Sequence, residues 1–365
     1  MYRVKIFGAG SIGNHLANAS RTLGWQVVVC DRDPAALERM KSQIYPGRYG
    51  KWDDTIQLCL NDNAPRGSFD LIHIGTPPDW HLSLAMQALQ ESPRALLIEK
   101  PLCPPDLKGA QELFDAARNS KTKVYVGYDH VLGMAALKTE ELIKANVIGE
   151  IKTIDVDFRE HWGGIFAAHP WLSGPEDSYL GFTARGGGAS GEHSHALHFW
   201  QHLAHLCGGG AVSEVTANIR LVENGKARYD DLFLLTLQTE KGIVGRVVQD
   251  VVTQPPRKRA RVQGSTGALE WVCGYSPEGD AVLHLKPGAP EEVYLFKKKR
   301  PDDFLQELRH LQQQLENPAL SSPISLERGL DSMLVIAAAH ESASKKCSTR
   351  VRCGQNYATN AVSPA

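Results

Sequence analysis

Residues 6–16 read IFGAGSIGNHL, and this stretch decides the fold of the first part of the chain. Three glycines, Gly8, Gly10 and Gly13, stand at the spacing G-x-G-x-x-G between an apolar strand and a helical pattern. Because glycine lacks a Cβ atom, it permits a sharp turn and the close approach of another group. A strand, a glycine turn and a helix in this order predict a loop that cradles the pyrophosphate of a dinucleotide.

Each position of this loop has a predicted task. Gly8 allows the tight turn, Gly10 leaves room for the pyrophosphate and Gly13 lets the helix pack against the strand. The candidate cofactor contacts of the loop are Gly8, Ala9, Gly10, Ser11, Ile12 and Gly13. Asp31 ends the next strand, VVVCD, and is expected to accept hydrogen bonds from the adenosine ribose. Asp31 favours NAD, whereas the adjacent Arg32 leaves NADP open.

The 365-residue chain has the composition of a globular protein, with 42% hydrophobic residues, 22% charged residues and a formal net charge of -1. This balance gives no general attraction to nucleic acid or to a membrane, so the expected partner is a small molecule. The sequence has no apolar run long enough for a membrane span and no export-signal pattern at its start. Seven scattered cysteines without a C-x-x-C pair are typical of reduced thiols in the cytoplasm, where we expect the protein.

The order of the predicted elements indicates an α/β chain with two domains. Residues 1–127 alternate apolar strands with amphipathic helices, which predicts a parallel sheet and an N-terminal Rossmann dinucleotide-binding domain. Residues 128–348 contain several strands with short connections, which predicts a C-terminal α+β domain with an open, mostly antiparallel sheet. Residues 349–365 mix Gly, Asn, Ser and Pro and are expected to form a flexible tail.

A second group of motifs follows two further strands of the first domain. Residues 74–81 read IGTPPDWH and residues 96–102 read LLIEKPL. Since consecutive prolines cannot continue a strand, the chain turns at the carboxyl edge of the sheet, where ligands bind. Gly75 in this turn and Glu99 and Lys100 after the next strand are candidate cofactor contacts, because they lie at that edge. Lys100 is also the predicted proton-transferring group, the alternative being a surface lysine paired with a glutamate.

These motifs together resemble one family. The segments G-x-G-x-x-G, T-P-P-D-W-H, E-K-P and a G-G-G stretch before a histidine-bearing helix resemble the glucose-fructose oxidoreductase and inositol dehydrogenase family, often called Gfo/Idh/MocA. The resemblance spans nearly the whole chain. It implies a substrate cleft between a Rossmann domain and an open sheet domain, contact of Lys100 with a substrate hydroxyl, and a cis bond before Pro101. It also implies that Thr76, Pro77 and His81 lie beside the cofactor. It also implies homodimers or homotetramers formed through the exposed sheet face.

The activity that the resemblance implies is NAD(P)-dependent hydride transfer. The substrate would be a secondary alcohol or ketone of a sugar, sugar acid, sugar nucleotide or cyclitol, and Lys100 would be the acid/base. Two alternatives stay open: a reductase of a non-sugar substrate such as an imine, a pyrrole or a dihydrodiol, and a dinucleotide-binding sensor without turnover.

One segment departs from the family pattern. Members usually carry G-G-G-x-x-x-D-x-x-x-H, with the aspartate and the histidine one helical turn apart. Here Glu192 replaces the aspartate and Ala196 occupies the histidine position. We expect His195, three residues after Glu192, to assist Lys100, with Glu192 as its positioning group. His193 and His198 remain alternatives.

Further polar residues are candidate substrate contacts, because strand-borne polar groups that face a cleft can fix hydroxyl groups or a carboxylate. They are Asp129, His130, Arg159, His161, Arg185 and His193, in addition to Lys100 and His195. The alternative for each is pairing at a domain interface.

Four histidines, His195, His198, His202 and His205, recur at helical spacing with Glu192 one turn upstream, which suggests a zinc site. We assign no metal, because the sequence offers no second segment with a metal-binding pattern and most helical histidine rows are packed and hydrogen-bonded.

Overall fold

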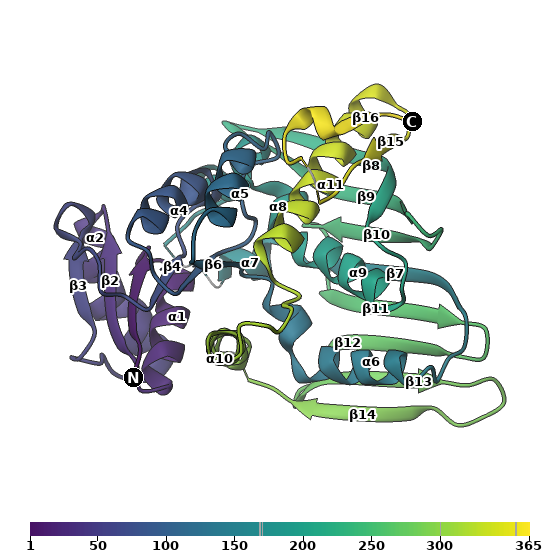
Figure 1. Cartoon of the computed structure of the whole chain (residues 1–365), viewed down its shortest axis with the longest axis horizontal. Coiled ribbons are helices and arrows are strands. Elements are labelled where there is room, and N and C mark those ends of the chain that lie inside the picture. The colour runs from purple at the N-terminus through teal and green to yellow at the C-terminus, as the bar shows by residue number, and fades with distance from the viewer. Residues whose placement is uncertain (168, 170, 300, 355) are drawn as a thin grey trace. The chain divides into compact units, whose positions relative to one another are not determined.

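The computed structural model describes residues 1–167, 169, 171–299, 301–354 and 356–365, which divide into two compact units (Figure 1). The first unit comprises Met1–Cys103, Gly109–Asp129 and Arg300–Leu326. The second unit comprises Pro104–Lys108, His130–Lys299 and Glu327–Ala365. Among the described residues, no helix has both the length and the apolar character needed to cross a membrane.

The first unit is built on a six-stranded parallel sheet in the order β3-β2-β1-β4-β5-β6. Its strands are β1 (Arg3–Phe7), β2 (Gln26–Asp31), β3 (Gln57–Leu60), β4 (Leu71–Ile74), β5 (Ala95–Ile98) and β6 (Lys123–Val126). The inner strands are apolar runs because both faces of the sheet are covered, and Val4, Ile72 and Leu96 are fully buried. The strand order reverses between β1 and β4, so ligands are expected at the carboxyl edge there. The predicted Rossmann domain is confirmed.

The helices of the first unit cover this sheet. They are α1 (Ser11–Thr22), α2 (Pro34–Arg39), the π-helical turn η1 (Met40–Ile44), α3 (Tyr45–Tyr49), α4 (His81–Gln90), α5 (Ala110–Arg118) and α10 (Asp302–Glu316), with 3-10 turns η2 (Asn61–Asn63) and η3 (Pro78–Trp80). The 3-10 turn η4 (Asp129–Leu132) begins with the last residue of the Gly109–Asp129 segment and continues into the second unit.

Helix α10 shows that the first unit is not a single continuous segment. The predicted domain limit at residue 127 leaves α10 outside the Rossmann domain, whereas the structure packs α10 against α1, with the rings of Phe304 and His15 stacked 4.6 Å apart. After α10 the chain reaches β6, where the Val126 N–H donates to the Ile324 carbonyl. The apolar face of α10, which includes Leu308 and Leu311, is buried by this packing.

The second unit contains a ten-stranded sheet in the order β14-β13-β12-β11-β7-β10-β9-β8-β15-β16. Strand β10 pairs with β7 in parallel and the other recorded pairs are antiparallel, which confirms the predicted mostly antiparallel sheet. The strands are β7 (Ile151–Arg159), β8 (Val212–Asn224), β9 (Ala227–Thr239), β10 (Val244–Asp250), β11 (Arg257–Gly264), β12 (Ala268–Ser276), β13 (Gly279–Leu285), β14 (Glu292–Lys297), β15 (Thr349–Val351) and β16 (Val362–Pro364).

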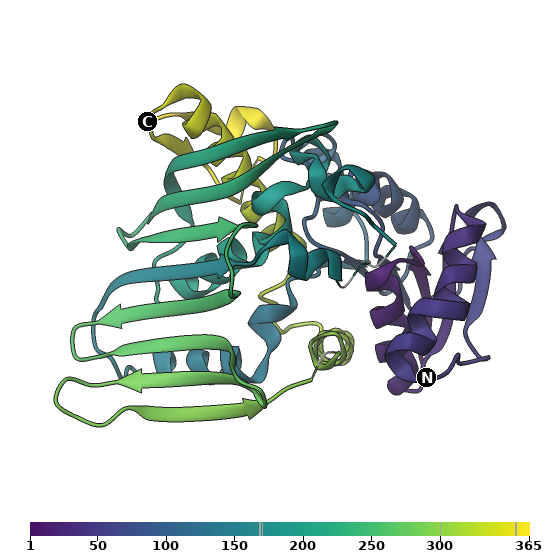
Figure 2. The same ribbon diagram turned by 180° about the vertical axis from the view of Figure 1, so that it is seen from behind.

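The helices of the second unit lie mainly on one side of this sheet. They are α6 (Met134–Lys144), α7 (Trp162–Ala167), α8 (Gly188–Glu192), α9 (Ser194–Leu206) and α11 (Leu326–Lys345), with 3-10 turns η5 (Pro175–Asp177), η6 (Tyr179–Gly181), η7 (Thr183–Arg185) and η8 (Thr359–Ala361). Helices α6 and α9 pack against one face (Figure 1), whereas Figure 2 shows β11 to β14 uncovered on the opposite face.

The last segment of the chain differs from the expected flexible tail. Residues 349–365 contain β15 and β16, which pair with each other, and Thr349 of β15 pairs with Val215 of β8. Because the free edge of β8 supplies backbone partners, this segment extends the sheet although its composition is typical of a loop.

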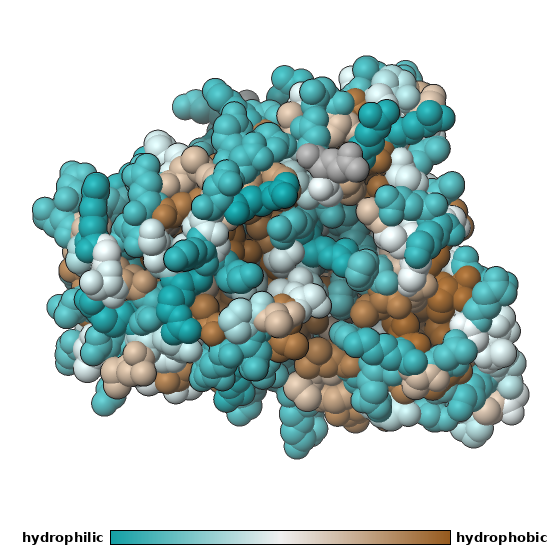
Figure 3. Space-filling model, viewed as in Figure 1, coloured by the Kyte–Doolittle hydropathy of each residue, from teal (hydrophilic) through white to brown (hydrophobic). Residues whose placement is uncertain are grey.

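Apolar surface is visible over the second unit in the lower right part of Figure 3. Met134 and Leu137 of α6 are 50% and 43% exposed, and Leu295 of β14 is 58% exposed. Exposed apolar side chains that gather in one region are typical of interaction surfaces.

His73 makes the first unit sensitive to acid. This residue lies within β4, is fully buried, and neither ring nitrogen has a hydrogen-bond partner among the described residues. Burial lowers the pKa of His73 to about 3. The unfolded chain takes up the proton near the ordinary pKa of about 6.5, so stability is complete above that pH and is lost as the pH falls from about 6.5 toward 3. This group alone should cost about 2 kcal/mol between pH 7 and pH 5.

The variant His73→Leu is expected to lack this loss, because leucine has no proton to bind. His205→Leu is the matched control, since His205 is exposed and burial lowers its pKa less than it lowers that of His73. Urea unfolding at pH 7 and at pH 5 measures the free energy of unfolding of both variants and of the natural chain. We expect the control and the natural chain to lose about 2 kcal/mol more stability than His73→Leu over this range. An equal loss in all three proteins would show that His73 is not the acid-sensitive group.

Candidate active site

In the glycine turn between β1 and α1, an added Cβ atom would clash at two of the three glycines and would find free space at the third. Gly8 has a φ of +105°, and a Cβ atom there would lie 2.6 Å from the Gly75 carbonyl oxygen. A Cβ atom on Gly13 would lie 1.8 Å from the Gly8 carbonyl oxygen, whereas one on Gly10 would meet no atom of the residues that the structure describes within 4 Å. Among the described residues, no side chain caps the N-terminus of α1 by a hydrogen bond. Open space above Gly10 beside an uncapped helix N-terminus fits a pyrophosphate.

Asp31 is held beside this turn at the end of β2. One carboxylate oxygen accepts from the Ala9 N–H at 2.7 Å and the other accepts from the Asp33 N–H at 2.9 Å. The neighbouring Arg32 guanidinium lies 5.0 Å from the centre of the Trp80 ring. The carboxylate is therefore fixed at the edge where an adenosine ribose is expected, and Arg32 is stacked on a partly exposed aromatic side chain.

The turn after β4 is tied to both neighbouring segments. The Gly75 N–H donates to the Phe7 carbonyl at 2.8 Å. The buried His81 places one ring nitrogen 2.7 Å from the Thr76 carbonyl and the other 3.0 Å from the Pro101 carbonyl. His81 thus holds the turn containing Thr76 and Pro77 against the E-K-P segment, which makes it a positioning residue for these two loops.

The E-K-P segment follows β5 at the same sheet edge. The Glu99 N–H donates to the Ile74 carbonyl, and the Lys100–Pro101 bond is cis, as the family resemblance implied. Glu99 is buried and Lys100 is half-buried. Burial raises the pKa of Glu99 to about 8, the negative charge of Asp129 acts in the same direction, and Lys100 opposes them. Lys100 therefore stands next to a carboxyl group that can hold a proton near neutral pH.

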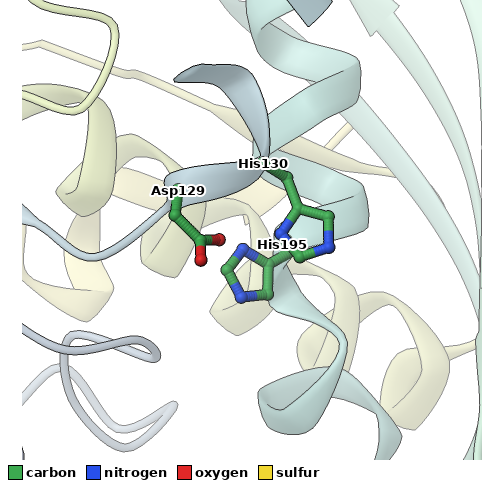
Figure 4. Close-up of side chains that lie close together, drawn as sticks. All are labelled: Asp129, His130 and His195. Carbon is green, nitrogen blue, oxygen red and sulfur yellow. The ribbon is translucent and has the colours of Figure 1, made fainter. Parts of the chain in front are cut away.

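Asp129 and His130 follow β6, and the boundary between the two units runs between them. Asp129 of the first unit is 9% exposed. In the second unit, the His130 ring lies 4.3 Å from the His195 ring, centre to centre, and 5.3 Å from the Phe158 ring. Figure 4 shows the rings of His130 and His195 side by side. The structure therefore brings two of the predicted substrate-binding histidines into contact.

Glu192 and His195 do not lie on one continuous helix. Helix α8 ends at Glu192, His193 interrupts the helix, and α9 begins at Ser194. His193 is buried, whereas Glu192 and His195 are half-buried. The expected spacing of one turn within a single helix was wrong, because the short α8 ends before the histidines begin.

One acidic and one amide side chain bind the glycine-rich segment at α8. The sequence patterns did not indicate either of them. Asp230 of β9 accepts from the Ser190 N–H at 2.6 Å and from the Thr183 hydroxyl at 2.7 Å. A Cβ atom on Gly188 would lie 2.2 Å from an Asp230 oxygen. Gln249 donates to the Ala189 carbonyl. The signal that could have found Asp230 is an acid inside the apolar strand pattern of residues 227–239.

The predicted substrate contacts on the second unit have partners of their own. The Arg159 guanidinium is ion-paired with the buried Asp250 of β10. The His161 ring accepts from the Gly163 N–H at 2.9 Å. Arg185 ends η7 with its guanidinium 6.0 Å from the centre of the Phe182 ring. Arg159 is therefore paired within the second unit and not at a domain interface.

The histidine row of α9 is spread over different contacts. The His198 ring lies 3.1 Å from the Ser332 hydroxyl, and His202 lies 3.9 Å from a Glu140 oxygen. Burial lowers the pKa of His202 to about 4. In the part of the chain that the structure describes, neither of these two residues nor His205 belongs to a group of three metal-ligating side chains.

The fold and the turn define an NAD-binding Rossmann oxidoreductase. Residues 2–128 match the family described as "oxidoreductase family, NAD-binding Rossmann fold", and residues 136–270 match its GFO/IDH/MocA C-terminal domain. The chain belongs to the Gfo/Idh/MocA family of oxidoreductases, which confirms the family, the enzyme class and NAD as the cofactor. None of the curated protein sequences matches the chain significantly.

Solved structures with this fold cover almost the whole chain. An oxidoreductase from Agrobacterium radiobacter in complex with NAD+, L-tartaric acid and magnesium is 19% identical with a TM-score of 0.74, covering 95% of this chain and 97% of its own. A putative myo-inositol dehydrogenase from Sinorhizobium meliloti 1021 is 21% identical, with a TM-score of 0.70. The match covers 95% of this chain and 99% of the dehydrogenase chain. Levoglucosan dehydrogenase in complex with NADH and L-sorbose is 16% identical, with a TM-score of 0.76. The match covers 97% of this chain and 99% of the levoglucosan dehydrogenase chain. These similarities show the shared fold.

Proposed function

We propose that this oxidoreductase transfers a hydride between NAD and a secondary alcohol or ketone of a sugar, sugar acid, sugar nucleotide or cyclitol, with Lys100 as the acid/base. The observation that carries the proposal is the position of Lys100 within the first unit. Strand β1 leads into the glycine turn and β5 leads into Lys100, and β4 lies between them in a parallel sheet. The carboxyl ends of these strands share one edge, so an amine stands at the edge that holds the pyrophosphate turn.

The residues of the chain would divide the work as follows. When bound, NAD supplies the acceptor of the hydride at its nicotinamide ring. Lys100 Nζ takes the hydroxyl proton as the carbon is oxidised, and returns a proton in the reverse direction. We propose that His195 assists this transfer and that Glu192 positions it, with His193 and His198 as the alternatives. Asp129, His130, His161 and Arg185 are the proposed contacts to substrate hydroxyls or a carboxylate.

The complexes formed by similar structures support a polyhydroxylated substrate. The Agrobacterium structure holds L-tartaric acid and levoglucosan dehydrogenase holds L-sorbose, and both ligands carry hydroxyl groups on adjacent carbons. The exposed apolar side chains of α6 and β14 support a homodimer or homotetramer. The seven cysteines are free, which supports the proposed cytoplasmic location.

A panel assay tests the proposed activity. Free sugars, sugar acids, sugar nucleotides and cyclitols are offered with NAD, and the absorbance of reduced nicotinamide is followed with time. We expect at least one member of the panel to be oxidised. One observation favours a sensor without turnover, namely Ala196 at the family's histidine position. NADH fluorescence that changes on addition of a sugar, with no turnover by any substrate, would support the sensor instead.

We also propose NAD in preference to NADP, because a fixed Asp31 carboxylate accepts from ribose hydroxyls and repels a 2′-phosphate. In Asp31→Ser, NADH affinity should fall roughly tenfold or more while NADPH affinity stays equal or rises. Asp33→Ser is the matched control, since Asp33 caps α2 through the Ala35 N–H and serine can cap equally well. Fluorescence titrations measure the affinity of each variant for NADH and for NADPH. An equal loss of affinity for the two cofactors would contradict this role of Asp31.

A further inference from the structure

Two cysteines of the first unit lie side by side in its sheet. Cys30 of β2 and Cys59 of β3 occupy paired positions of adjacent parallel strands. Their sulfur atoms are 3.2 Å apart, with one thiol donating to the other, and both cysteines are free. Adjacent strands are about 4.8 Å apart, which lies within the Cα separation of about 4.4 to 6.8 Å that a disulfide spans. The sheet therefore holds the two sulfurs at positions from which they can bond.

The two cysteines differ in their exposure to solvent. Cys30 is fully buried, and burial raises the pKa of its thiol. Cys59 is half-buried and lies on β3, the strand at one edge of the sheet. Because an oxidant reacts with an accessible sulfur in its thiolate form, Cys59 is the sulfur that a dissolved oxidant attacks first. Cys30 is then the sulfur that reacts with the oxidised Cys59.

Cys30 is connected to the glycine turn through its backbone. Its carbonyl accepts from the Gly8 N–H at 2.8 Å. The next residue, Asp31, accepts from the Ala9 N–H at 2.7 Å and is paired with Leu60 of β3. The ends of β2 and β3 are thus joined to two residues of the turn that binds the cofactor.

A disulfide would alter these contacts. A sulfur–sulfur bond is about 2.05 Å long, about 1 Å shorter than the present contact between Cys30 and Cys59. Since the Cys30 side chain is packed on all sides, part of this shortening must come from movement of the backbone of β2. A binding site requires its groups to stay within about 0.5 Å of their productive positions, so a movement of this size disturbs Gly8 and Asp31.

We propose that Cys30 and Cys59 are a redox-sensitive pair, in which a peroxide forms a disulfide that weakens the binding of NAD. The weakening rests on the proposed contact of Asp31 with the adenosine ribose. Formation of the bond itself depends only on the two cysteines and the peroxide.

The chemistry takes two steps. The Cys59 thiolate attacks one oxygen of hydrogen peroxide, the O–O bond breaks, and Cys59 becomes a sulfenic acid as hydroxide leaves. Cys30 Sγ then attacks Cys59 Sγ, the S–O bond breaks, and the departing hydroxide takes the Cys30 proton as water. The two sulfurs lose two electrons in total, the peroxide gains them, and two water molecules form once the first hydroxide is protonated. A thiol reductant reverses the change by thiol–disulfide exchange.

Peptide mapping of the full chain without cofactor tests whether the bond forms. The chain is treated with hydrogen peroxide, free thiols are alkylated, and tryptic peptides are identified by mass spectrometry. We expect a pair of peptides joined through Cys30 and Cys59, which dithiothreitol separates. Cys347→Ser is the matched control, since Cys347 is a half-buried cysteine of the second unit, and it should form the same pair. Cys30 that is still alkylated after treatment of the natural chain, or Cys59 joined to another cysteine, would overturn the proposal.

Fluorescence titration with NADH tests the effect on the cofactor. The Kd of the peroxide-treated natural chain should be roughly threefold or more above that of the reduced chain, and dithiothreitol should restore it. Cys59→Ser should have the same Kd before and after treatment, because it cannot form the bond. Equal Kd values for the reduced and the disulfide-bonded natural chain, or an equal loss in Cys59→Ser, would overturn the proposal. If Cys59→Ser does not fold, Cys59→Ala takes its place.

The two proposals can fail separately. If Asp31→Ser binds NADH as the natural chain does, the proposed contact with the ribose is wrong, and the peptide map still decides whether the disulfide forms. If Asp31→Ser loses NADH affinity but the disulfide-bonded chain keeps it, only the present inference is wrong.

Discussion

Replacing Lys100 with methionine is expected to lower turnover by roughly 10²- to 10⁴-fold, the usual contribution of a positioned acid or base. Methionine keeps the length of the side chain but cannot bind the hydroxyl proton. Affinity for NADH should change little, because the glycine turn and Asp31 are intact. The effect should therefore appear in kcat rather than in cofactor binding.

Lys123→Met is the matched control for this experiment. Lys123 is exposed and begins β6, so the same substitution is made at the opposite end of the same sheet. Steady-state rates and NADH fluorescence titrations are measured for both variants. Turnover of Lys100→Met within a few fold of the natural rate would exclude Lys100 as the acid/base.

The substitutions Gly13→Ala and Gly10→Ala should separate folding from cofactor binding. In Gly13→Ala the new methyl group would lie 1.8 Å from the Gly8 carbonyl oxygen, and the obstacle is backbone that cannot move cheaply. We expect a loss of about 3 kcal/mol of stability or more. Gly10 has a φ of -76° and free space around its Cβ position, so Gly10→Ala should fold with an unchanged melting temperature.

Gly10→Ala should weaken cofactor binding although it leaves the stability of the fold unchanged. The added methyl group of Gly10→Ala stands where the pyrophosphate approaches the backbone, so NADH affinity should fall at least tenfold, about 1.4 kcal/mol. Thermal unfolding with and without NADH measures both effects. Natural NADH affinity in Gly10→Ala would show that the pyrophosphate does not lie on this turn.

The Rossmann half of the fold could be predicted because its signals are local. Apolar runs give the buried strands, the glycines give the turn after β1, and Thr76 and Lys100 fall at strand ends where a parallel sheet collects its ligand-binding residues. Strand β3 (Gln57–Leu60) gives no such signal, because its residues are half-buried or exposed at the edge of the sheet.

The parts that could not be predicted depend on contacts between distant segments. The pattern of residues 302–316 predicts a helix with one apolar face, but nothing in it says that this face returns to the first unit. Glu307 therefore resembles an ordinary surface glutamate in the sequence, although it is fully buried. The parallel pairing of β10 with β7 and the antiparallel pairing of β15 with β8 likewise join segments that no local pattern connects.

The candidate site shows the same division. The glycine turn and the E-K-P segment follow from short motifs, whereas α8 ends at Glu192 in a segment that Asp230 and Gln249, both distant in the chain, bind through Ser190 and Ala189. A helical spacing counted through His193 could not reveal that the helix stops there. The sequence could not reveal the partners of Arg159 and His198 either, since Asp250 and Ser332 lie far from them in the chain.

The central claim is that hydride passes directly between a substrate carbinol carbon and NAD held at the glycine turn. The measurement that tests it most directly uses the best substrate of the panel, deuterated at the carbon that is oxidised, and locates the label in the reduced cofactor by nuclear magnetic resonance. We predict one deuterium at C4 of the nicotinamide, formed rapidly by the natural chain and very slowly by Lys100→Met. Reduced nicotinamide without deuterium, or a chain that binds NADH but oxidises no member of the panel, would contradict the account.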